Sequence, residues 1–187
     1  RRYPRCKYWV NPNGCFGDQQ SIRGIGFRLL CRFHFDLLDA QMKILVTGAS
    51  GFVGQALLTR LELAGHGVSA ITRSEIGNVD GKADWLPHLA DIDAIVHLAA
   101  RVHVMQDTAK ASLSLYRTVN TEGTIRLAEA AREMKVHRFV YVSSIKVNGD
   151  QSDGHLTAQD PAAPQDPYAI SKWEAEQALA RMASDLD

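Results

Sequence analysis

The sequence predicts an α/β fold in which helices cover both faces of a doubly wound parallel sheet. From residue 42 onward, short apolar runs rich in β-formers alternate with longer segments of helical periodicity. Strands that alternate with helices at this spacing indicate βαβ units with right-handed crossovers. A glycine-rich run, Gly48-x-x-Gly51-x-x-Gly54, joins the first apolar run to the first helical segment. That context is typical of a dinucleotide-binding loop.

Length and composition fit one globular domain. The 187 residues are 45% hydrophobic and 22% charged, which is typical of a folded chain rather than a disordered one. Because the formal net charge is zero, the overall charge favours neither nucleic acid nor an acidic membrane as a partner. The apolar stretch 22–38 is broken by charged residues and predicts neither a signal peptide nor a membrane span. We therefore expect a cytoplasmic protein.

A compositional boundary falls at Met42. Residues 1–41 carry seven basic and three acidic side chains, whereas residues 42–187 carry 14 and 18. All three cysteines precede Met42, at a spacing that favours neither a disulfide framework nor a zinc site, and we expect no metal. Met42 directly precedes the first predicted strand, as a natural start would. We interpret residues 1–41 as a poorly ordered upstream extension and residues 42–187 as the folded domain.

The local pattern predicts each element in turn. Lys43–Thr47 is too short and too rich in β-formers for a helix, which indicates a buried parallel strand. Apolar residues then recur at helical spacing over 52–64 and stop at Gly65, a residue suited to a helix end. Asp166 suits the cap of the last helix and Pro167 its first turn. The remaining predicted strands are 67–72, 93–99 and 138–143, and the remaining helices are 112–135 and 167–182.

The three loop glycines each have a physical reason. Gly48 permits a tight turn, Gly51 lets the backbone approach a pyrophosphate, and Gly54 allows the helix to pack closely on the sheet. The N-terminus of that helix would face the anion. The loop therefore predicts a Rossmann-type sheet that binds NADP or NAD. The loop residues expected to contact this cofactor are Gly48, Ser50, Gly51, Phe52, Val53 and Gly54.

The residues after the second strand bear on the choice of cofactor. An acidic side chain there would bind the adenosine ribose 2′-hydroxyl, but this chain has Thr72-Arg73-Ser74. Because an arginine can bind a 2′-phosphate, Arg73 favours NADP over NAD. The alternative is that Arg73 stacks on adenine or points to solvent.

Tyr168 and Lys172 lie one helical turn apart in the last predicted helix, so their side chains share one face. A nearby cation favours a phenolate, and we expect it to lower the pKa of Tyr168 toward the range where a phenol exchanges protons with a substrate hydroxyl. Ser143-Ser144 precedes the pair. Together with the glycine loop, these residues indicate hydride transfer to or from a nicotinamide.

Five motifs occur in a fixed order: Thr47-Gly-Ala-Ser-Gly-Phe-Val-Gly54, His97-Leu-Ala-Ala100, Asn120-Thr-Glu-Gly-Thr124, Val142-Ser-Ser144 and Tyr168-x-x-x-Lys172. They resemble the extended short-chain dehydrogenase/reductases, specifically the NAD-dependent epimerase/dehydratase family typified by UDP-glucose 4-epimerase. The likeness covers residues 42–182. Residues 100–105 and 143–149 also look like a bacterial subgroup associated with surface-polysaccharide sugars.

The resemblance implies hydride transfer at carbon 4 of a nucleotide sugar, expected to be UDP-linked. It implies that Tyr168 is the general acid/base on the sugar 4-hydroxyl, that Lys172 tunes it and binds the nicotinamide ribose, and that Ser144 hydrogen-bonds the reacting oxygen. Further residues expected to lie at the cofactor are Leu98, Ala99, Ala100 and Asn120. We expect His97, on a buried strand, to be a packed, hydrogen-bonded histidine, and we assign no catalytic role to it or to His103.

The chain departs from the family pattern at two points. Asn148 stands where the family usually has a tyrosine, and the chain stops at Asp187, so we expect a Rossmann domain truncated before the C-terminal substrate-binding part. Several functions stay open: a 4-epimerase, a 4-keto reductase, which a preference for NADP favours slightly, a non-catalytic nicotinamide-binding module, and an inactive fragment of a longer enzyme. A homodimer is the expected assembly of the full-length form.

Overall fold

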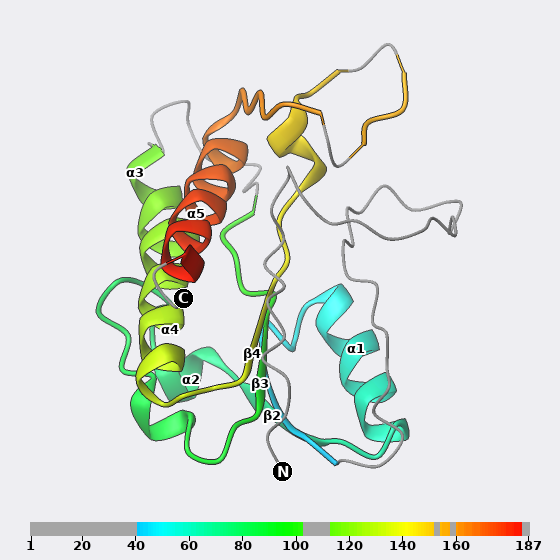
Figure 1. Cartoon of the computed structure of the whole chain (residues 1–187), viewed down its shortest axis with the longest axis vertical. Coiled ribbons are helices and arrows are strands. Elements are labelled where there is room, and N and C mark those ends of the chain that lie inside the picture. The colour runs from blue at the N-terminus through cyan, green and yellow to red at the C-terminus, as the bar shows by residue number, and fades with distance from the viewer. Residues whose placement is uncertain (1–40, 103–112, 152–153, 158–159, 185–187) are drawn as a thin grey trace.

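The structure, a computed structural model, describes residues 41–102, 113–151, 154–157 and 160–184. Four strands, β1 (Lys43–Thr47), β2 (Gly67–Ile71), β3 (Ala94–His97) and β4 (Arg138–Tyr141), form one sheet in the order β2-β1-β3-β4. Every pairing is parallel. Helix α1 (Phe52–Leu63) covers one face, and α4 (Gly123–Glu133) and α5 (Pro167–Ser184) cover the other (Figure 1). The predicted doubly wound α/β fold is confirmed.

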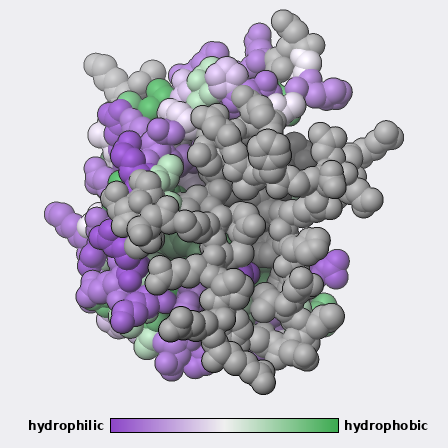
Figure 2. Space-filling model, in the orientation of Figure 1, coloured by the Kyte–Doolittle hydropathy of each residue, from purple (hydrophilic) through white to green (hydrophobic). Residues whose placement is uncertain are grey.

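The predicted extension, residues 1–41, lies outside the described residues apart from Gln41, and so do the three cysteines and His103. Within the described residues, no helix is both long enough and apolar enough to cross a membrane. On the face drawn in Figure 2, hydrophilic side chains cover most of the visible described surface.

Two core clusters lie on opposite faces of the sheet because side chains alternate along each strand. Leu45 and Ile95 pack with Leu127 of α4, whereas Ile44 and Val46 pack on the α1 side. Strand β1 lies between β2 and β3, and its residues from Ile44 to Thr47 are all buried. This burial explains why β1 reads as a continuous apolar run.

The last three strands are shorter at their carboxyl ends than the sequence pattern predicts. β2 ends at Ile71, β3 at His97 and β4 at Tyr141. Beyond these residues the chain leaves the sheet to form the loops at its carboxyl edge. The residues that the sequence pattern placed at the carboxyl ends of these strands therefore lie in the loops of the candidate site.

Both predicted helix boundaries with a physical signal are confirmed. Gly65 follows the end of α1 with a φ of +81°, the left-handed conformation that favours glycine. Asp166 accepts a hydrogen bond from the Ala169 amide at 2.7 Å, which is the N-cap geometry at the start of α5.

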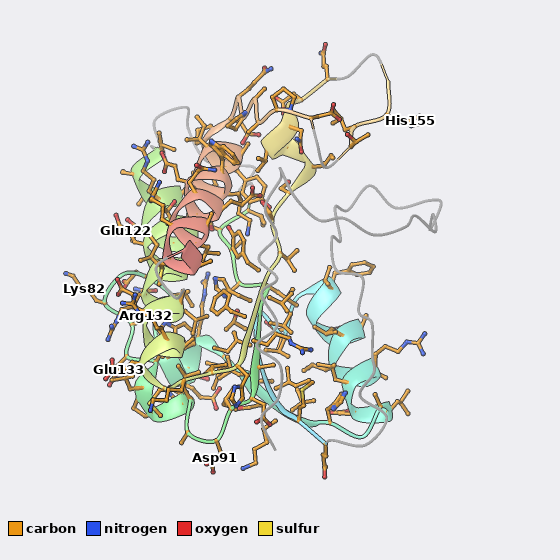
Figure 3. The ribbon with its side chains drawn as sticks, in the orientation of Figure 1. Lys82, Asp91, Glu122, Arg132, Glu133 and His155 are labelled. Carbon is orange, nitrogen blue, oxygen red and sulfur yellow. The ribbon has the colours of Figure 1, made fainter. Side chains whose placement is uncertain are left out.

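The predicted helix at residues 112–135 is three segments in the described part: α3 (Leu113–Tyr116), a π-helical turn η2 (Arg117–Glu122) and α4. The short helix α2 (Arg73–Ile76) and two 3₁₀ turns, η1 (Leu86–His88) and η3 (Ile145–Asn148), complete the elements. The side chains of Glu122, Arg132 and Glu133 point away from the sheet (Figure 3). The polar outer surface of this helical region thus faces solvent.

Candidate active site

The candidate site lies at the carboxyl edge of the sheet, between β1 and β3. These strands are neighbours, but the chain runs from β1 to β2 on one side and from β3 to β4 on the other. Such a switch in strand order opens the crevice in which α/β proteins bind ligands. Gly48 follows β1 and lies against the chain after β3: a Cβ on Gly48 would stand 2.7 Å from the Ala99 nitrogen. The two strand ends approach so closely that only glycine fits.

The loop glycines serve different needs. A Cβ on Gly54 would stand 2.4 Å from the Gly48 oxygen, so Gly54 is required for packing. Gly51 is not, because its φ of −76° suits any residue and a Cβ there would meet only one backbone oxygen, at 3.3 Å. Gly51 is exposed, and as the N-cap of α1 it leaves the first helix amides without a side-chain cap. An anion is what such amides bind.

The rest of the predicted loop is open to solvent. Ser50 and Val53 are exposed, and Phe52 is 90% exposed. Its backbone is nevertheless ordered by hydrogen bonds, because the Gly51 amide donates to the Gly48 oxygen and the Gln55 side chain donates to the Ser50 oxygen, each at 3.0 Å. The loop is therefore a preformed backbone surface that is open to solvent.

His97 is fully buried between two threonines. Its Nδ1 lies 2.6 Å from the Thr47 hydroxyl, and its Nε2 lies 3.0 Å from the Thr124 hydroxyl. The Thr47 hydroxyl also accepts from the Ala99 amide, and the Thr124 hydroxyl donates to the Asn120 oxygen. Thr47 therefore donates to Nδ1, and Nε2–H donates to Thr124. Burial lowers the pKa of His97 to about 3, so the ring is neutral, and the expected packed, hydrogen-bonded histidine is confirmed.

Asn120 ties the chain after β3 to α5. Its Oδ1 accepts from the Arg101 amide at 2.7 Å, and its Nδ2 donates to the Arg101 oxygen at 3.0 Å and to the Ser171 hydroxyl at 2.9 Å. Asn120 lies in the π-helical turn, a feature that often marks functional sites. Asn120 therefore fixes the backbone of Arg101, directly after Leu98–Ala100, and links it to α5.

Tyr168 and Ser144 come together from different elements. Ser144 precedes η3 and Tyr168 lies in the first turn of α5. Burial raises the pKa of Tyr168, and the nearby Ser144 hydroxyl opposes that rise. The predicted lowering of this pKa by Lys172 is therefore wrong for the chain as it stands.

The position of Lys172 explains why it does not lower the pKa of Tyr168. Its ammonium lies over a different tyrosine, 4.2 Å from the centre of the Tyr141 ring. Lys172 is 2% exposed, and burial lowers its pKa to about 7, against the opposing effect of Glu176. The Tyr141 ring in turn stacks on His97, with centroids 5.9 Å apart. His97, Tyr141 and Lys172 thus form a buried column under the site. The sequence pattern placed Lys172 on the face of Tyr168 but did not single out Tyr141.

Arg73 is the first residue of α2, and its side chain is exposed. The nearest acidic residue, Glu75, is engaged: its Oε2 accepts from both the amide and the hydroxyl of Thr72, each at 2.8 Å. These hydrogen bonds lower the pKa of Glu75. The carboxylate that could have bound a ribose hydroxyl is thus held in a helix cap.

Two further predicted features have clear places. Asn148, where the family pattern has a tyrosine, is buried, and its Nδ2 donates to the Asp160 oxygen at 3.0 Å. In the part of the chain that the structure describes, no three His, Cys, Asp or Glu side chains gather as a metal site.

Comparison with known proteins places the chain in a family. Residues 44–186 match the model of the NAD dependent epimerase/dehydratase family. The chain belongs to this family. A UDP-glucose 4-epimerase from Vibrio cholerae is 39% identical over 155 residues, which are 76% of this chain and 47% of that protein. A dTDP-glucose 4,6-dehydratase from Streptomyces niveus is 32% identical over 157 residues, which are 70% of this chain and 46% of that protein.

Solved structures of this family resemble the chain in fold. MoeE5 in complex with UDP-glucose and NAD is 32% identical, with a TM-score of 0.65 over 73% of this chain and 47% of that one. RMD from Pseudomonas aeruginosa, complexed with NADPH, is 26% identical, with a TM-score of 0.64 over 78% and 51%. The chain spans about half the length of the relatives it matches. NAD and NADPH in these structures agree with the cofactor predicted from the glycine loop.

Proposed function

We propose that the protein modifies a nucleotide sugar by hydride transfer at carbon 4 of the sugar, with Tyr168 exchanging the proton of the 4-hydroxyl. One observation carries the proposal: Ser144 and Tyr168, from separate elements, lie close enough for Ser144 to lower the pKa of Tyr168, at the carboxyl edge of the sheet where the Gly48 loop also lies. A phenol near a hydroxyl and a dinucleotide loop is suited to proton transfer coupled to hydride transfer. The similarity to a UDP-glucose 4-epimerase supports a UDP-linked substrate.

The residues of the chain fit the cofactor. The uncapped amides at the start of α1 would hold the pyrophosphate, with Gly51 leaving room for it. Leu98, Ala99 and Ala100 would line the cofactor, and Lys172 would bind the nicotinamide ribose. When bound, NAD or NADP supplies the acceptor and donor of the hydride.

Each catalytic side chain has a distinct task. Because burial raises its pKa, Tyr168 carries its proton at neutral pH and can donate it to a forming hydroxyl. Ser144 stabilises the phenolate that remains, since its hydroxyl lowers the pKa of Tyr168. Lys172 lies with its ammonium over the Tyr141 ring, and its proposed task is to bind the nicotinamide ribose.

We infer from Arg73 that NADP is preferred over NAD, which favours a 4-keto reductase over an epimerase. Arg73 is exposed at the end of β2, and the only acidic side chain in α2 is committed to the cap. A net reduction draws on NADPH, whereas an epimerase recycles its own cofactor. The setting we propose is cytoplasmic synthesis of a sugar for a bacterial surface polysaccharide, by a homodimer of the complete enzyme.

The test is Tyr168→Phe in the full-length form of the enzyme, assayed for NAD(P)-dependent conversion of UDP-hexoses and UDP-4-keto sugars. Turnover should fall by about 100- to 10,000-fold, the usual effect of removing a general acid/base, while cofactor affinity stays unchanged. Tyr116→Phe is the matched control, because it keeps the ring that meets Tyr168 edge-on at 6.4 Å. Full activity of Tyr168→Phe would refute the mechanism. Tight cofactor binding without any turnover by the unaltered full-length form would favour a non-catalytic nicotinamide-binding module.

A further inference from the structure

An ion pair joins the loop that carries Ser144 to the helix that carries Tyr168. Lys146, in η3, places its Nζ 2.5 Å from Oδ2 of Asp166, the cap of α5. A second carboxylate, Asp150, lies 3.7 Å from the same Nζ. The pair is therefore the side-chain link between two elements that meet at the candidate site.

Each partner of the pair also binds next to one of the two catalytic hydroxyls. The backbone amide of Lys146 donates to the Ser144 hydroxyl at 3.3 Å. Oδ1 of Asp166 accepts from the Ala169 amide at 2.7 Å, and the Asp166 oxygen accepts from the Ile170 amide at 2.9 Å. The first turn of α5, which presents Tyr168, is thus anchored by the same carboxylate that binds Lys146.

The exposure of the pair argues against a mainly stabilising role. The Lys146 side chain is 43% exposed and that of Asp166 is 28% exposed, and exposed ion pairs contribute little to folding. The two charges have a larger effect on the neighbouring Tyr168 phenol than on folding. A charge of either sign close to a half-buried group shifts the proton equilibrium of that group.

We propose that Lys146 and Asp166 are positioning residues, which keep Ser144 and Tyr168 aligned and whose opposite charges balance each other at the Tyr168 phenol. The alignment follows from the contacts above and does not depend on the substrate. Its catalytic consequence rests on the proposed function.

The charges around Tyr168 act in the directions this requires. Asp166 raises the pKa of Tyr168 and Lys146 lowers it, after the larger effects of burial and of Ser144. The hydrogen bond to Asp166 raises the pKa of Lys146, which favours the cationic form of Lys146. The other titratable or charged groups on the elements packed around Tyr168 include Arg101, Tyr116, Arg117, Glu122, Tyr141, Asp150, Lys172, Glu174, Glu176 and Arg181.

The effects of Lys146 and Asp166 on Tyr168 can be distinguished because the two residues carry opposite charges. Lys146→Met and Asp166→Asn break the same ion pair, and asparagine preserves the helix cap. A purely structural effect would shift the titration of Tyr168 in the same direction in both variants. A charge effect predicts that Tyr168 titrates at higher pH in Lys146→Met and at lower pH in Asp166→Asn than in the unaltered chain. Lys146→Arg keeps the charge and should restore the original titration.

The measurement is an NMR titration of the chain labelled with ¹³C at the tyrosine Cζ. The sequence has five tyrosines, and the signal missing from Tyr168→Phe identifies Tyr168. Thermal unfolding of each variant establishes that it is folded, and Lys82→Met, which changes a surface lysine that points away from the ribbon (Figure 3), is the control for loss of a positive charge.

Opposite shifts with rescue by Lys146→Arg support the proposal. Shifts in the same direction, or none in either variant, overturn it. The titration needs no substrate, so it is independent of the proposed reaction. If the opposite shifts occur but the complete, unaltered enzyme converts no nucleotide sugar, the proposed function fails while the positioning role stands.

Discussion

Lys172→Met should make the protein more stable below neutral pH. The unaltered chain buries the Lys172 ammonium, which lowers its pKa from 10.5 to about 7. At ~1.4 kcal/mol per unit of pKa, this difference corresponds to a destabilisation on the order of 5 kcal/mol when the group must be protonated in the folded state. Methionine has a similar length and no charge, so it removes this cost and loses the contact of the ammonium with Tyr141, worth about 0.5–2 kcal/mol, together with the attraction of Glu176.

The pH dependence gives the prediction its sign. Between pH 7 and 10.5 the unfolded chain keeps the Lys172 proton and the folded chain releases it. The free energy of unfolding of the unaltered protein should therefore rise with pH, relative to the variant, by up to ~1.4 kcal/mol per unit in this window. Below pH 7 the full penalty is present. The stability advantage of Lys172→Met should thus be several kcal/mol at pH 6 and should have vanished by about pH 10.

Urea unfolding at a series of pH values measures this difference. Trp85 is completely buried in the core, so tryptophan fluorescence reports the transition. Lys82→Met provides the comparison for loss of a surface lysine. If the curves of the unaltered protein and Lys172→Met run parallel from pH 6 to 10, then Lys172 keeps its ordinary pKa in the fold and the burial argument is wrong.

The other predictions concern the cofactor loop and its specificity. Gly51→Val should fold normally, because the backbone of Gly51 suits any residue, but titration should show at least a tenfold loss of NAD(P) affinity; equal affinity would remove the loop assignment. Gly54→Ala should instead lower stability by about 1–3 kcal/mol or more, since its Cβ would meet two backbone oxygens at 2.4 and 2.6 Å; an unchanged urea midpoint would contradict this. The unaltered protein should bind NADP more tightly than NAD, and Arg73→Ala should narrow the gap; a preference for NAD would refute the role of Arg73.

The parts of the structure that depend on local pattern could be predicted. The strand β1, the glycine at the end of α1 and the Asp166 cap follow from periodicity and from the backbone preferences of single residues. The buried character of His97 also followed from its place in an apolar run. In each case the information lies within a few positions along the chain.

The parts of the structure that depend on residues far apart in the sequence could not be predicted. Asn120 bonds to Arg101 and Ser171, 19 and 51 positions away, so the interruption of the long helix by a π-helical turn had no local signal. Helical spacing placed Lys172 beside Tyr168, but the sequence did not reveal the Tyr141 ring that holds the ammonium. The predicted direction of the pKa shift of Tyr168 was wrong for the same reason, because the burial that raises this pKa is a property of the assembled fold.

The threonine–histidine–threonine chain beneath the site has a consequence for redesign. Its hydrogen bonds run in one direction from the Ala99 amide to the Asn120 oxygen, so each group depends on the orientation of the next. Replacing one member with an apolar residue leaves its neighbours with buried, unmet polar atoms, at a cost of about 1–3 kcal/mol for each. Thr47, His97 and Thr124 therefore behave as one unit in any library of variants, and their exchange must also provide new partners for the Ala99 amide and the Asn120 oxygen.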